Sequence, residues 1–340
     1  MMRRSVIFQA PGQVQTALEA VPGPAPGEVL VEIEVSAISA GTELLIYRGQ
    51  APSDMSLDDT LPGLSGAFRF PLRYGYAAAG TVAAAGQAVD SAWLGRRVFG
   101  FCPHASHVLA KPADLVPVPE DIGLRDAVFF ANVETAVTLL LDGLPAVGEH
   151  VVVLGQGVVG LLATRLLSTY PLAALFTVEP LALRREASVQ AGAHAVFDPA
   201  LPQALHDRLR EVTEGGMADL VFELSGHPSA LGAAIAGAGF GARIVLGSWY
   251  GTRPVAVDLG GRFHRSRIRL IGSQVSTLPP GFLGRWTRRR RFSAAWEQIR
   301  RIAPSRLITH EIPVEAAAEA YALLDQNPGQ ALQVLLTHRP

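Results

Sequence analysis

Cysteine is almost absent from this chain, because Cys102 is the single cysteine among 340 residues. One thiol can form neither an intrachain disulfide nor a cysteine-based zinc cluster. Charged residues are also scarce, at 17%, and they nearly cancel to a formal net charge of −1. Such a chain has no general attraction for nucleic acid or anionic membranes, so any anion must bind locally.

Long apolar runs are lacking as well. No segment approaches 18 uninterrupted apolar residues, and the N-terminal residues MMRRSVIFQAPGQVQ contain no apolar run of signal-peptide length. We therefore expect a cytoplasmic protein without a membrane span. With 49% hydrophobic residues, the 340-residue chain is long enough for two domains that each bury a core.

Residues 1–125 favour β-structure. Short β-branched or alternating runs occur at 5–10, 28–39, 80–86, 96–101 and 106–110, separated by glycine and proline. This pattern is typical of a compact, partly closed β domain.

From about residue 126 the pattern changes to alternating strands and helices. The expected strands are 150–155, 173–179, 194–198, 218–226, 242–248 and 268–274, and helical patterns lie between most of them. Six strands in this order predict a doubly wound parallel sheet, which is an α/β fold. After residue 277 come an Arg-rich helix, a strand, a second helix and a last strand.

The strongest chemical signal is Gly155-Gln156-Gly157-Val158-Val159-Gly160, between an expected strand and an expected helix. The first glycine permits a tight turn, the second lets the backbone approach a pyrophosphate, and the third lets the helix pack on the strand. The phosphates would lie at the helix N-terminus, beside Val158 and Val159. A glycine-rich turn without a ligand is the competing interpretation.

An acid follows the motif at the required place. Glu179 ends the next strand, 19 residues after Gly160. A carboxylate there accepts hydrogen bonds from the adenosine ribose and repels a 2′-phosphate, which favours NAD over NADP. NADP stays an alternative, because Arg184 and Arg185 would serve a 2′-phosphate if Glu179 turned away.

The order of parts resembles the medium-chain dehydrogenase/reductase superfamily over essentially the whole chain. The segments that carry the resemblance are SAISAGTELLIYRG (36–49), PLRYGYAAAGTV (71–82), ANVETAVTLL (131–140), VVVLGQGVVG (151–160) and LITHEIPVEAAAEAYALL (307–324). The chain looks most like the subgroup of bacteriochlorophyllide dehydrogenases and proteins labelled zinc-binding alcohol dehydrogenases. The resemblance implies a GroES-like catalytic domain at 1–125 and 277–340, and a Rossmann dinucleotide-binding domain at 126–276.

The positions that hold catalytic zinc in this superfamily lack metal donors here. Ala40 replaces the cysteine of a C-G-T-D motif, and Tyr76-Ala77 replaces the His-Glu pair of a G-H-E motif. If Thr135 is the threonine near the nicotinamide, Ala131 replaces the third ligand. The four-cysteine structural zinc lobe is missing too. Zinc needs three or four N, S or O donors, so the resemblance implies a member without zinc.

Cys102, His104 and His107 lie close together in sequence and are a second candidate metal site. Their spacing matches no established ligand pattern. A strand-turn-strand with partly exposed histidines is therefore the preferred interpretation.

Without a Lewis acid, a hydrogen-bond donor must bind the substrate oxygen. The resemblance places Tyr76 beside the position of the metal, and a phenol is protonated at neutral pH, so it can donate in the reducing direction. Packing is an equally weighted role for Tyr76. Thr42 matches the hydroxyl that relays a proton in zinc-dependent members, although Leu45 replaces the histidine that often follows.

Glu134 is a third catalytic candidate. In an expected helix at 126–141 it would share a face with Ala131 and Thr135. A buried carboxylate there could act as acid or base, and a structural hydrogen-bond acceptor is the alternative. Glu43 has more the character of a supporting residue than of a catalytic one.

The same matching implies residues that hold the nicotinamide. They are Thr135, Leu224, Ser225, Gly247, Ser248 and Ser273 to Val275, with Trp249 and Tyr250 near the rim of the cleft. The basic run Arg285–Arg291 follows this segment and is interpreted as a solvated helix face or as a site for an anionic substrate.

These observations predict a zinc-independent oxidoreductase that transfers hydride between NAD(H), or NADP(H), and an alcohol/ketone pair of a small molecule. An enoyl or quinone reductase is the main alternative, because a C=C reduction needs only hydride and a proton donor. A nucleotide-binding sensor without catalysis is the second. By resemblance we expect a homodimer through the edge strand at 268–274, and no membrane or nucleic-acid partner.

Overall fold

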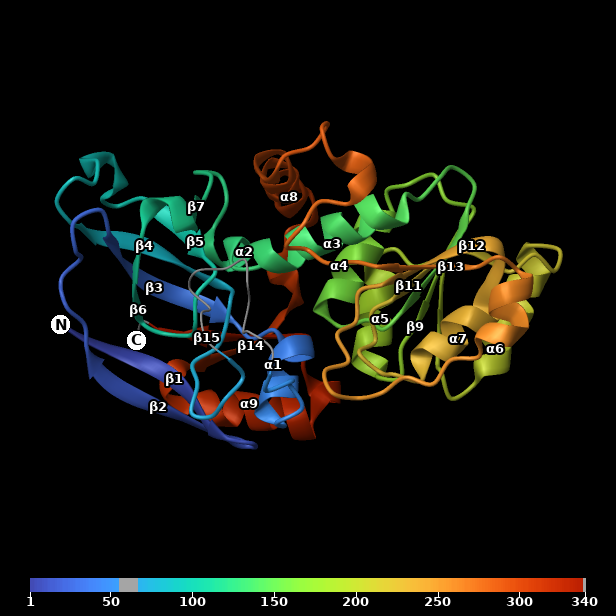
Figure 1. Ribbon diagram of the computed structural model, residues 1–340, viewed down its shortest axis with the longest axis horizontal. Coiled ribbons are helices and arrows are strands. Elements are labelled where there is room, and N and C mark those ends of the chain that lie inside the picture. The colour runs from blue at the N-terminus through green and yellow to red at the C-terminus, as the bar shows by residue number, and fades with distance from the viewer. Residues whose placement is uncertain (55–66, 339–340) are drawn as a thin grey trace. The chain divides into compact units, whose positions relative to one another are not determined.

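The computed structural model describes residues 1–54 and 67–338, and it divides into two compact units (Figure 1). Unit 1 comprises Met1–Ala131 and Ile299–Pro340, and unit 2 comprises Asn132–Gln298. Residues 277–298 thus belong to unit 2 by their contacts, whereas the sequence assigned them to the first domain. Most of the segment 50–70, a loop on which the shape of a substrate cleft would depend, lies outside the described residues.

Unit 1 is built on β-sheets, as its sequence pattern predicts. The strands are β1 (Met2–Ala10), β2 (Gln13–Ala20), β3 (Val29–Ala37), β4 (Ala78–Ala85), β5 (Arg97–Gly100), β6 (His107–Ala110), β7 (Leu115–Pro117), β14 (Ile308–Pro313) and β15 (Gln333–Thr337). Seven of them form a sheet in the order β14-β15-β3-β4-β5-β7, in which β6 also pairs with β3, while β1 and β2 pair with each other. Three helices complete the unit: α1 (Ala40–Tyr47), α2 (Leu124–Ala127) and α9 (Ala317–Gln326).

The core of unit 1 comes from alternating residues of its central strands. Val29, Val31 and Ile33 of β3 are at most 2% exposed and pack with Ala78, Val82 and Val98 of the next strands. Successive side chains of a strand point to opposite faces, so this alternation fixes the register between β3 and β4. The register then determines which residues of the β3–α1 and β4 segments meet.

Unit 2 holds the doubly wound parallel sheet. Its strands are β8 (His150–Leu154), β9 (Ala174–Val178), β10 (Ala195–Phe197), β11 (Ala218–Glu223), β12 (Ala238–Leu246) and β13 (Arg269–Gly272). They pair in the order β10-β9-β8-β11-β12-β13, and every pair is parallel. The helices α4 (Val158–Leu167), α5 (Ala182–Gln190), α6 (Pro202–Val212) and α7 (Ala230–Gly237) connect successive strands. The α/β fold class is confirmed.

The strand order of unit 2 reverses between β8 and β11. The chain leaves β8 toward β9 and β10 on one side and returns to β11 on the other. The carboxyl ends of β8 and β11 therefore border the crevice where ligands bind in such sheets. Continuous buried runs, such as Val151–Leu154 in β8, are what a parallel strand covered on both faces requires.

Two local expectations differ from the structure. The expected helix at 126–141 is two helices, α2 and α3 (Phe130–Gly143), with a turn between them. Unit 1 also contains β2 and α1, which the sequence patterns did not predict. Helix α8 (Arg288–Ile302) contributes residues to both units, since unit 2 ends at Gln298. No helix of the described residues is long and apolar enough to cross a membrane.

Candidate active site

The glycine motif forms the turn between β8 and α4, and its first and third glycines are required by packing. Gly155 has φ +89°, and a Cβ there would lie 2.4 Å from the Ser225 Cα atom at the end of β11. A Cβ on Gly160 would lie 2.1 Å from the Gly155 carbonyl oxygen. Both contacts are too short for any side chain, so these glycines allow the strand ends and the helix to come together.

Gly157 is the exception in the motif. It is the N-cap of α4, no side chain caps the helix there, and a Cβ would meet nothing within 4 Å. The first N–H groups of α4, at Val158 and Val159, lack an intrahelical partner because they begin the helix. Open space in front of free N–H groups at a helix N-terminus fits a dinucleotide pyrophosphate.

Glu179 follows β9 directly and is 3% exposed. Its Oε2 accepts the backbone N–H of Gln156 at 2.7 Å, and its Oε1 accepts that of Leu181 at 3.1 Å. The carboxylate is thus fixed beside the glycine turn. Burial lowers the pKa of the nearby Arg184, and the Glu179 charge opposes this shift. Among the described residues, the Arg184 Nε has no hydrogen-bond partner.

The residues expected to hold the nicotinamide gather around a buried acid that the sequence analysis missed. Glu223, at the end of β11, is fully buried and accepts the Ser225 N–H at 2.9 Å, the Ser225 hydroxyl at 2.5 Å and the Tyr250 hydroxyl at 2.6 Å. Ser248 accepts the Gly226 N–H at 2.8 Å. Glu223 therefore ties together two of the loops at the carboxyl edge of the sheet.

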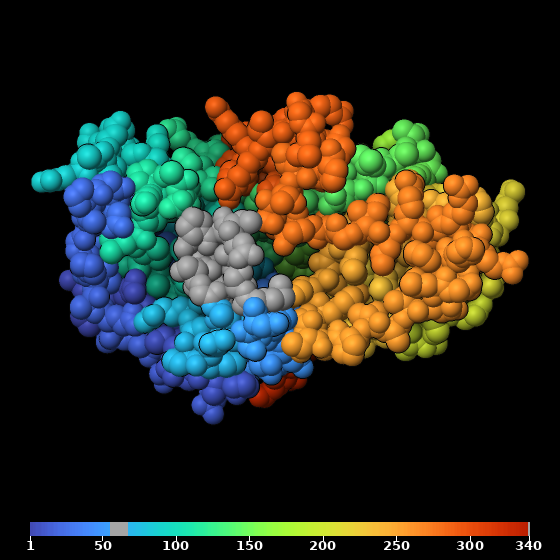
Figure 2. Space-filling view, in the orientation of Figure 1, coloured from blue at the N-terminus to red at the C-terminus, as the bar shows by residue number. Residues whose placement is uncertain are grey.

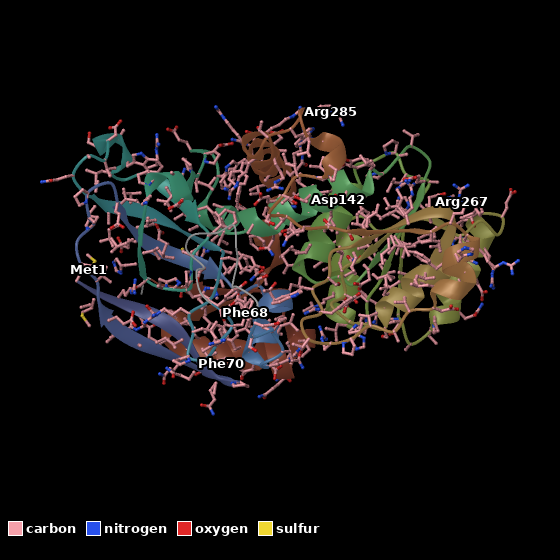
Figure 3. All side chains as sticks on the ribbon, viewed as in Figure 1. Met1, Phe68, Phe70, Asp142, Arg267 and Arg285 are labelled. Carbon is pink, nitrogen blue, oxygen red and sulfur yellow. The ribbon has the colours of Figure 1, made fainter. Side chains whose placement is uncertain are left out.

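The other expected nicotinamide residues lie on neighbouring elements of unit 2. A Cβ on Gly247 would lie 2.7 Å from the side chains of Leu139 and Leu224, so glycine is the residue that fits there. Ser273, after β13, donates to Asp142 of α3 at 2.7 Å, and Asp142 is labelled in Figure 3. Thr135 lies on α3, and Val275 lies two residues beyond Ser273. Their contact with a cofactor stays a prediction.

In unit 1 the structure brings Tyr76 and Thr42 together and adds a residue that the sequence analysis missed. The Tyr76 hydroxyl forms a hydrogen bond with the Ser39 hydroxyl, and the Thr42 hydroxyl lies close enough to lower the pKa of the phenol. Burial raises the pKa of the Tyr76 phenol, the two hydroxyls oppose the rise, and the Glu43 carboxylate adds to it. We call Tyr76, Ser39 and Thr42 the hydroxyl cluster.

Helix α1 presents two members of the hydroxyl cluster. Ser39 is the N-cap of α1, a position where a serine hydroxyl ordinarily accepts an N–H of the first turn, yet its side chain makes no cap bond. Glu43 fixes the backbone of this N-cap instead, because its Oε1 accepts the N–H of Ser39 itself at 2.7 Å. The Ser39 hydroxyl is thereby left for Tyr76.

Glu43 is the centre of a fully buried polar network. Its Oε2 accepts the Tyr321 hydroxyl at 2.5 Å and lies 3.0 Å from His104 Nε2. The other ring nitrogen of His104, Nδ1, is 2.7 Å from the Ser36 hydroxyl. Gly75 makes room for this ring, since a Cβ there would lie 2.8 Å from it. The network fixes the start of α1, where Ser39 bonds Tyr76. This arrangement suits the supporting role expected of Glu43.

The three residues of the second candidate metal site bond to different partners and not to a common centre. His104 binds Glu43 and Ser36, His107 bonds Ser106 at 3.0 Å, and the Cys102 thiol faces the Gly100 carbonyl. Burial raises the pKa of Cys102 to about 12, which disfavours a thiolate ligand. Within residues 1–54 and 67–338, no group of three or more His, Cys, Asp or Glu side chains is arranged to hold a metal ion.

Glu134 lies on α3 in unit 2, where it is nearly buried and pairs with Arg291 of α8 at 2.6 Å. Burial raises the pKa of Glu134, and the charge of Arg291 opposes this rise. Arg291 also donates to the Thr277 carbonyl at 2.8 Å. The pairing gives Glu134 a structural partner, and its catalytic role stays a prediction.

The other arginines of the basic run are exposed, and the orange segment that contains the run lies at the surface in Figure 2. Arg285, labelled in Figure 3, stacks over Phe282, and Arg290 stacks over Trp286 with 4.4 Å between the guanidinium carbon and the ring centroid. Arg288 and Arg289 open the first turn of α8, where the positive end of the helix dipole disfavours cations. One arginine of the run is therefore part of the core, and the others face solvent.

Each of the two units contains a match to a known protein family. Residues 25–133 match the family of alcohol dehydrogenase GroES-like domains, and residues 158–297 match the family of zinc-binding dehydrogenases. The D-guloside 3-dehydrogenase of Escherichia coli K12 is 23% identical over 330 residues, which cover 91% of this chain and 93% of that protein. The 2-desacetyl-2-hydroxyethyl bacteriochlorophyllide A dehydrogenase of Cereibacter sphaeroides is 28% identical over 369 residues, covering 100% and 99%.

The fold is also that of a solved dehydrogenase. The crystal structure of the alcohol dehydrogenase rspB of E. coli CFT073, complexed with NADH, superposes with a TM-score of 0.80 at 21% identity and covers 99% of both chains. The matched relatives are dehydrogenases, and this chain is an NAD(P)-dependent oxidoreductase. The chain belongs to the medium-chain dehydrogenase/reductase superfamily, as a member of the zinc-type alcohol dehydrogenase-like group.

Proposed function

We propose that this chain is a zinc-independent dehydrogenase that transfers hydride between NAD(H) and an alcohol/ketone pair. The observation that carries the proposal is the set of side chains at the zinc-ligand positions. Ala40 and Ala131 offer no donor atom, and Tyr76 offers one phenol oxygen that already bonds Ser39 and lies close to Thr42. A zinc site needs at least three protein donors, so these residues do not fit the metal.

In this proposal the hydroxyl cluster does the work that zinc does in other members. Bound NADH supplies a hydride to the carbonyl carbon of the substrate. Tyr76 donates its proton to the carbonyl oxygen as negative charge develops there. Its raised pKa keeps the phenol protonated at neutral pH, as this direction of the reaction requires. Thr42 supplies a second hydroxyl at the same oxygen of Tyr76.

We propose NAD as the preferred cofactor. Gly157 and the N-terminus of α4 fit a pyrophosphate, and Glu179 is held beside them by two backbone N–H groups. A fixed carboxylate at the end of the second strand favours a ribose with free hydroxyls and repels a 2′-phosphate. We also propose a homodimer through β13, which within the described residues pairs with β12 on one side and with no strand on the other.

Metal analysis tests the central claim. Protein purified without chelator should contain well under one zinc per chain. Its oxidation of NADH with a panel of ketones should persist after incubation with a strong zinc chelator. Stoichiometric zinc, or activity that disappears with the chelator and returns with zinc, would refute zinc independence. Turnover only on enones or quinones would assign the alternative reductase activity, and cofactor binding without turnover would indicate a sensor.

A further inference from the structure

Ser39 occupies a position whose ordinary structural role it does not fill. As the N-cap of α1, a serine hydroxyl stabilises a helix by accepting an N–H of the first turn, typically by about 1 kcal/mol. The Ser39 hydroxyl gives up this bond and joins Tyr76 instead. A serine hydroxyl that bonds a distant side chain, and not the first turn of its own helix, indicates that the distant side chain needs this bond.

The surroundings of Ser39 hold it in this arrangement. Glu43 binds the Ser39 N–H, and Glu43 is itself fixed by His104 and Tyr321, all of them fully buried or nearly so. The Ser39 carbonyl accepts the N–H groups of Thr42 and Glu43 at 3.0 and 2.8 Å, so the first turn of α1 closes without help from its hydroxyl. The hydroxyl is therefore dispensable for the helix.

We infer that Ser39 is a positioning residue for catalysis, which orients the Tyr76 phenol and stabilises the phenolate that forms when Tyr76 gives up its proton. This inference rests on the proposed role of Tyr76. During carbonyl reduction the substrate oxygen gains the π-electron pair of the C=O bond and takes the Tyr76 proton. The Tyr76 O–H bond breaks, its electron pair stays on the phenol oxygen, and the Ser39 O–H points at that charge. Solvent then returns a proton to Tyr76.

The sign of the effect follows from the charges around Tyr76. Glu43 on α1 disfavours the phenolate, the hydroxyls of Ser39 and Thr42 favour it, and His104 and Tyr321 act from behind Glu43. Removal of the Ser39 hydroxyl takes away one favourable bond. The Tyr76 titration should therefore move to higher pH, and proton donation should become slower.

Ser39→Ala tests the inference, with Ser39→Thr as the conservative variant. Titration of protein labelled with [¹³Cζ]tyrosine follows each phenol without any substrate, and Tyr76→Phe identifies the Tyr76 resonance. We expect Ser39→Ala to move the Tyr76 titration upward and to lower turnover about five- to tenfold, the effect of one hydrogen bond. Unfolding temperature and NADH affinity should change little. Ser39→Thr should keep both the titration and the rate near those of the wild type.

Ser106→Ala is the matched control. Ser106 is a buried serine of unit 1, and among the described residues its hydroxyl bonds the Arg4 N–H and His107 but not Tyr76. This variant should leave the Tyr76 titration unchanged. An unshifted Tyr76 titration in Ser39→Ala overturns the inference and leaves the proposed function standing. Full turnover in Tyr76→Phe instead removes the proposed role of Tyr76, whatever the Ser39 variants do.

Discussion

At the scale of single residues, Tyr76 carries the chemistry of the proposal. Tyr76→Phe removes the phenol hydroxyl and keeps the ring, which packs edge-on against Tyr74 with centroids 6.1 Å apart. Turnover of a ketone should fall about 100-fold or more, the usual contribution of a positioned general acid, while NADH affinity should stay within about twofold. Single-turnover kinetics and a fluorescence titration of NADH measure the two effects separately. An unchanged rate would reduce Tyr76 to a packing residue.

Glu179 decides the cofactor at the same scale. Glu179→Ala should weaken NADH binding about tenfold and NADPH binding much less, because the ribose hydroxyls lose their acceptor. The same change leaves the Gln156 N–H without its partner, so part of the loss is structural. Glu179→Gln is the control, since its one carbonyl oxygen still accepts the Gln156 N–H while the charge and the acceptor for the Leu181 N–H are removed; this variant should bind NADPH more tightly than the wild type does. A greater loss for NADPH in Glu179→Ala would reverse the assignment.

Sequence analysis predicted those site residues that belong to a recognisable motif or to a segment with a family resemblance. The three glycines and Glu179 were predicted because a motif fixes their place relative to a strand, and Tyr76 was predicted because the resemblance to the superfamily places it beside the metal position. Ser39 and Tyr321 were missed, because their partners are 37 and 278 residues away in the chain. Such contacts depend on the register of β3 with β4 and on the return of α9, and no local pattern encodes either.

At the scale of elements, two glycines of the turn between β8 and α4 allow the stability of the fold to be tested separately from cofactor binding. Gly157→Ala should cost no more than about 1 kcal/mol of unfolding free energy, because its Cβ meets nothing within 4 Å and only the N-cap preference is lost. Gly155→Ala, at φ +89° and 2.4 Å from Ser225, should cost more than about 3 kcal/mol. Chemical denaturation without cofactor measures both.

The stabilisation by bound cofactor should be affected in the opposite order, with the larger loss in Gly157→Ala. NADH at 100 times its dissociation constant stabilises the folded wild type by about 2.7 kcal/mol. Gly157→Ala should lose most of this stabilisation, because its methyl group occupies the space proposed for the pyrophosphate. Gly155→Ala, where it folds, should keep more of it. If Gly157→Ala kept the full shift in unfolding temperature with NADH, the pyrophosphate would not lie there.

Helix α1 and the turn between α2 and α3 were not predicted from sequence patterns, and both have the same physical cause, which is continuous burial. Helix α1 is buried from Glu43 to Tyr47, so it shows no polar stripe and no helical periodicity, and it is only eight residues long. The turn between α2 and α3 lies in a fully buried segment, Ala127–Phe130, where apolar residues continue without interruption. The central parallel strands β8 and β11 were predicted because a buried apolar run of about five residues close to a glycine favours a strand.

At the scale of the whole molecule, one edge of the unit 2 sheet is the site proposed for self-association. Strand β13 is largely exposed over Arg269–Gly272, with Leu270 41% exposed, and an unpaired apolar edge invites a second strand. Light scattering after gel filtration should give twice the 36.1 kDa of one chain. Leu270→Lys, which places a charge on the edge, should shift the mass toward the monomer at micromolar concentration. Leu18→Lys is the control, because Leu18 is 62% exposed on β2 in the other unit and should leave the dimer intact. A wild-type monomer, or a dimer equally sensitive to both changes, would exclude β13 as the interface.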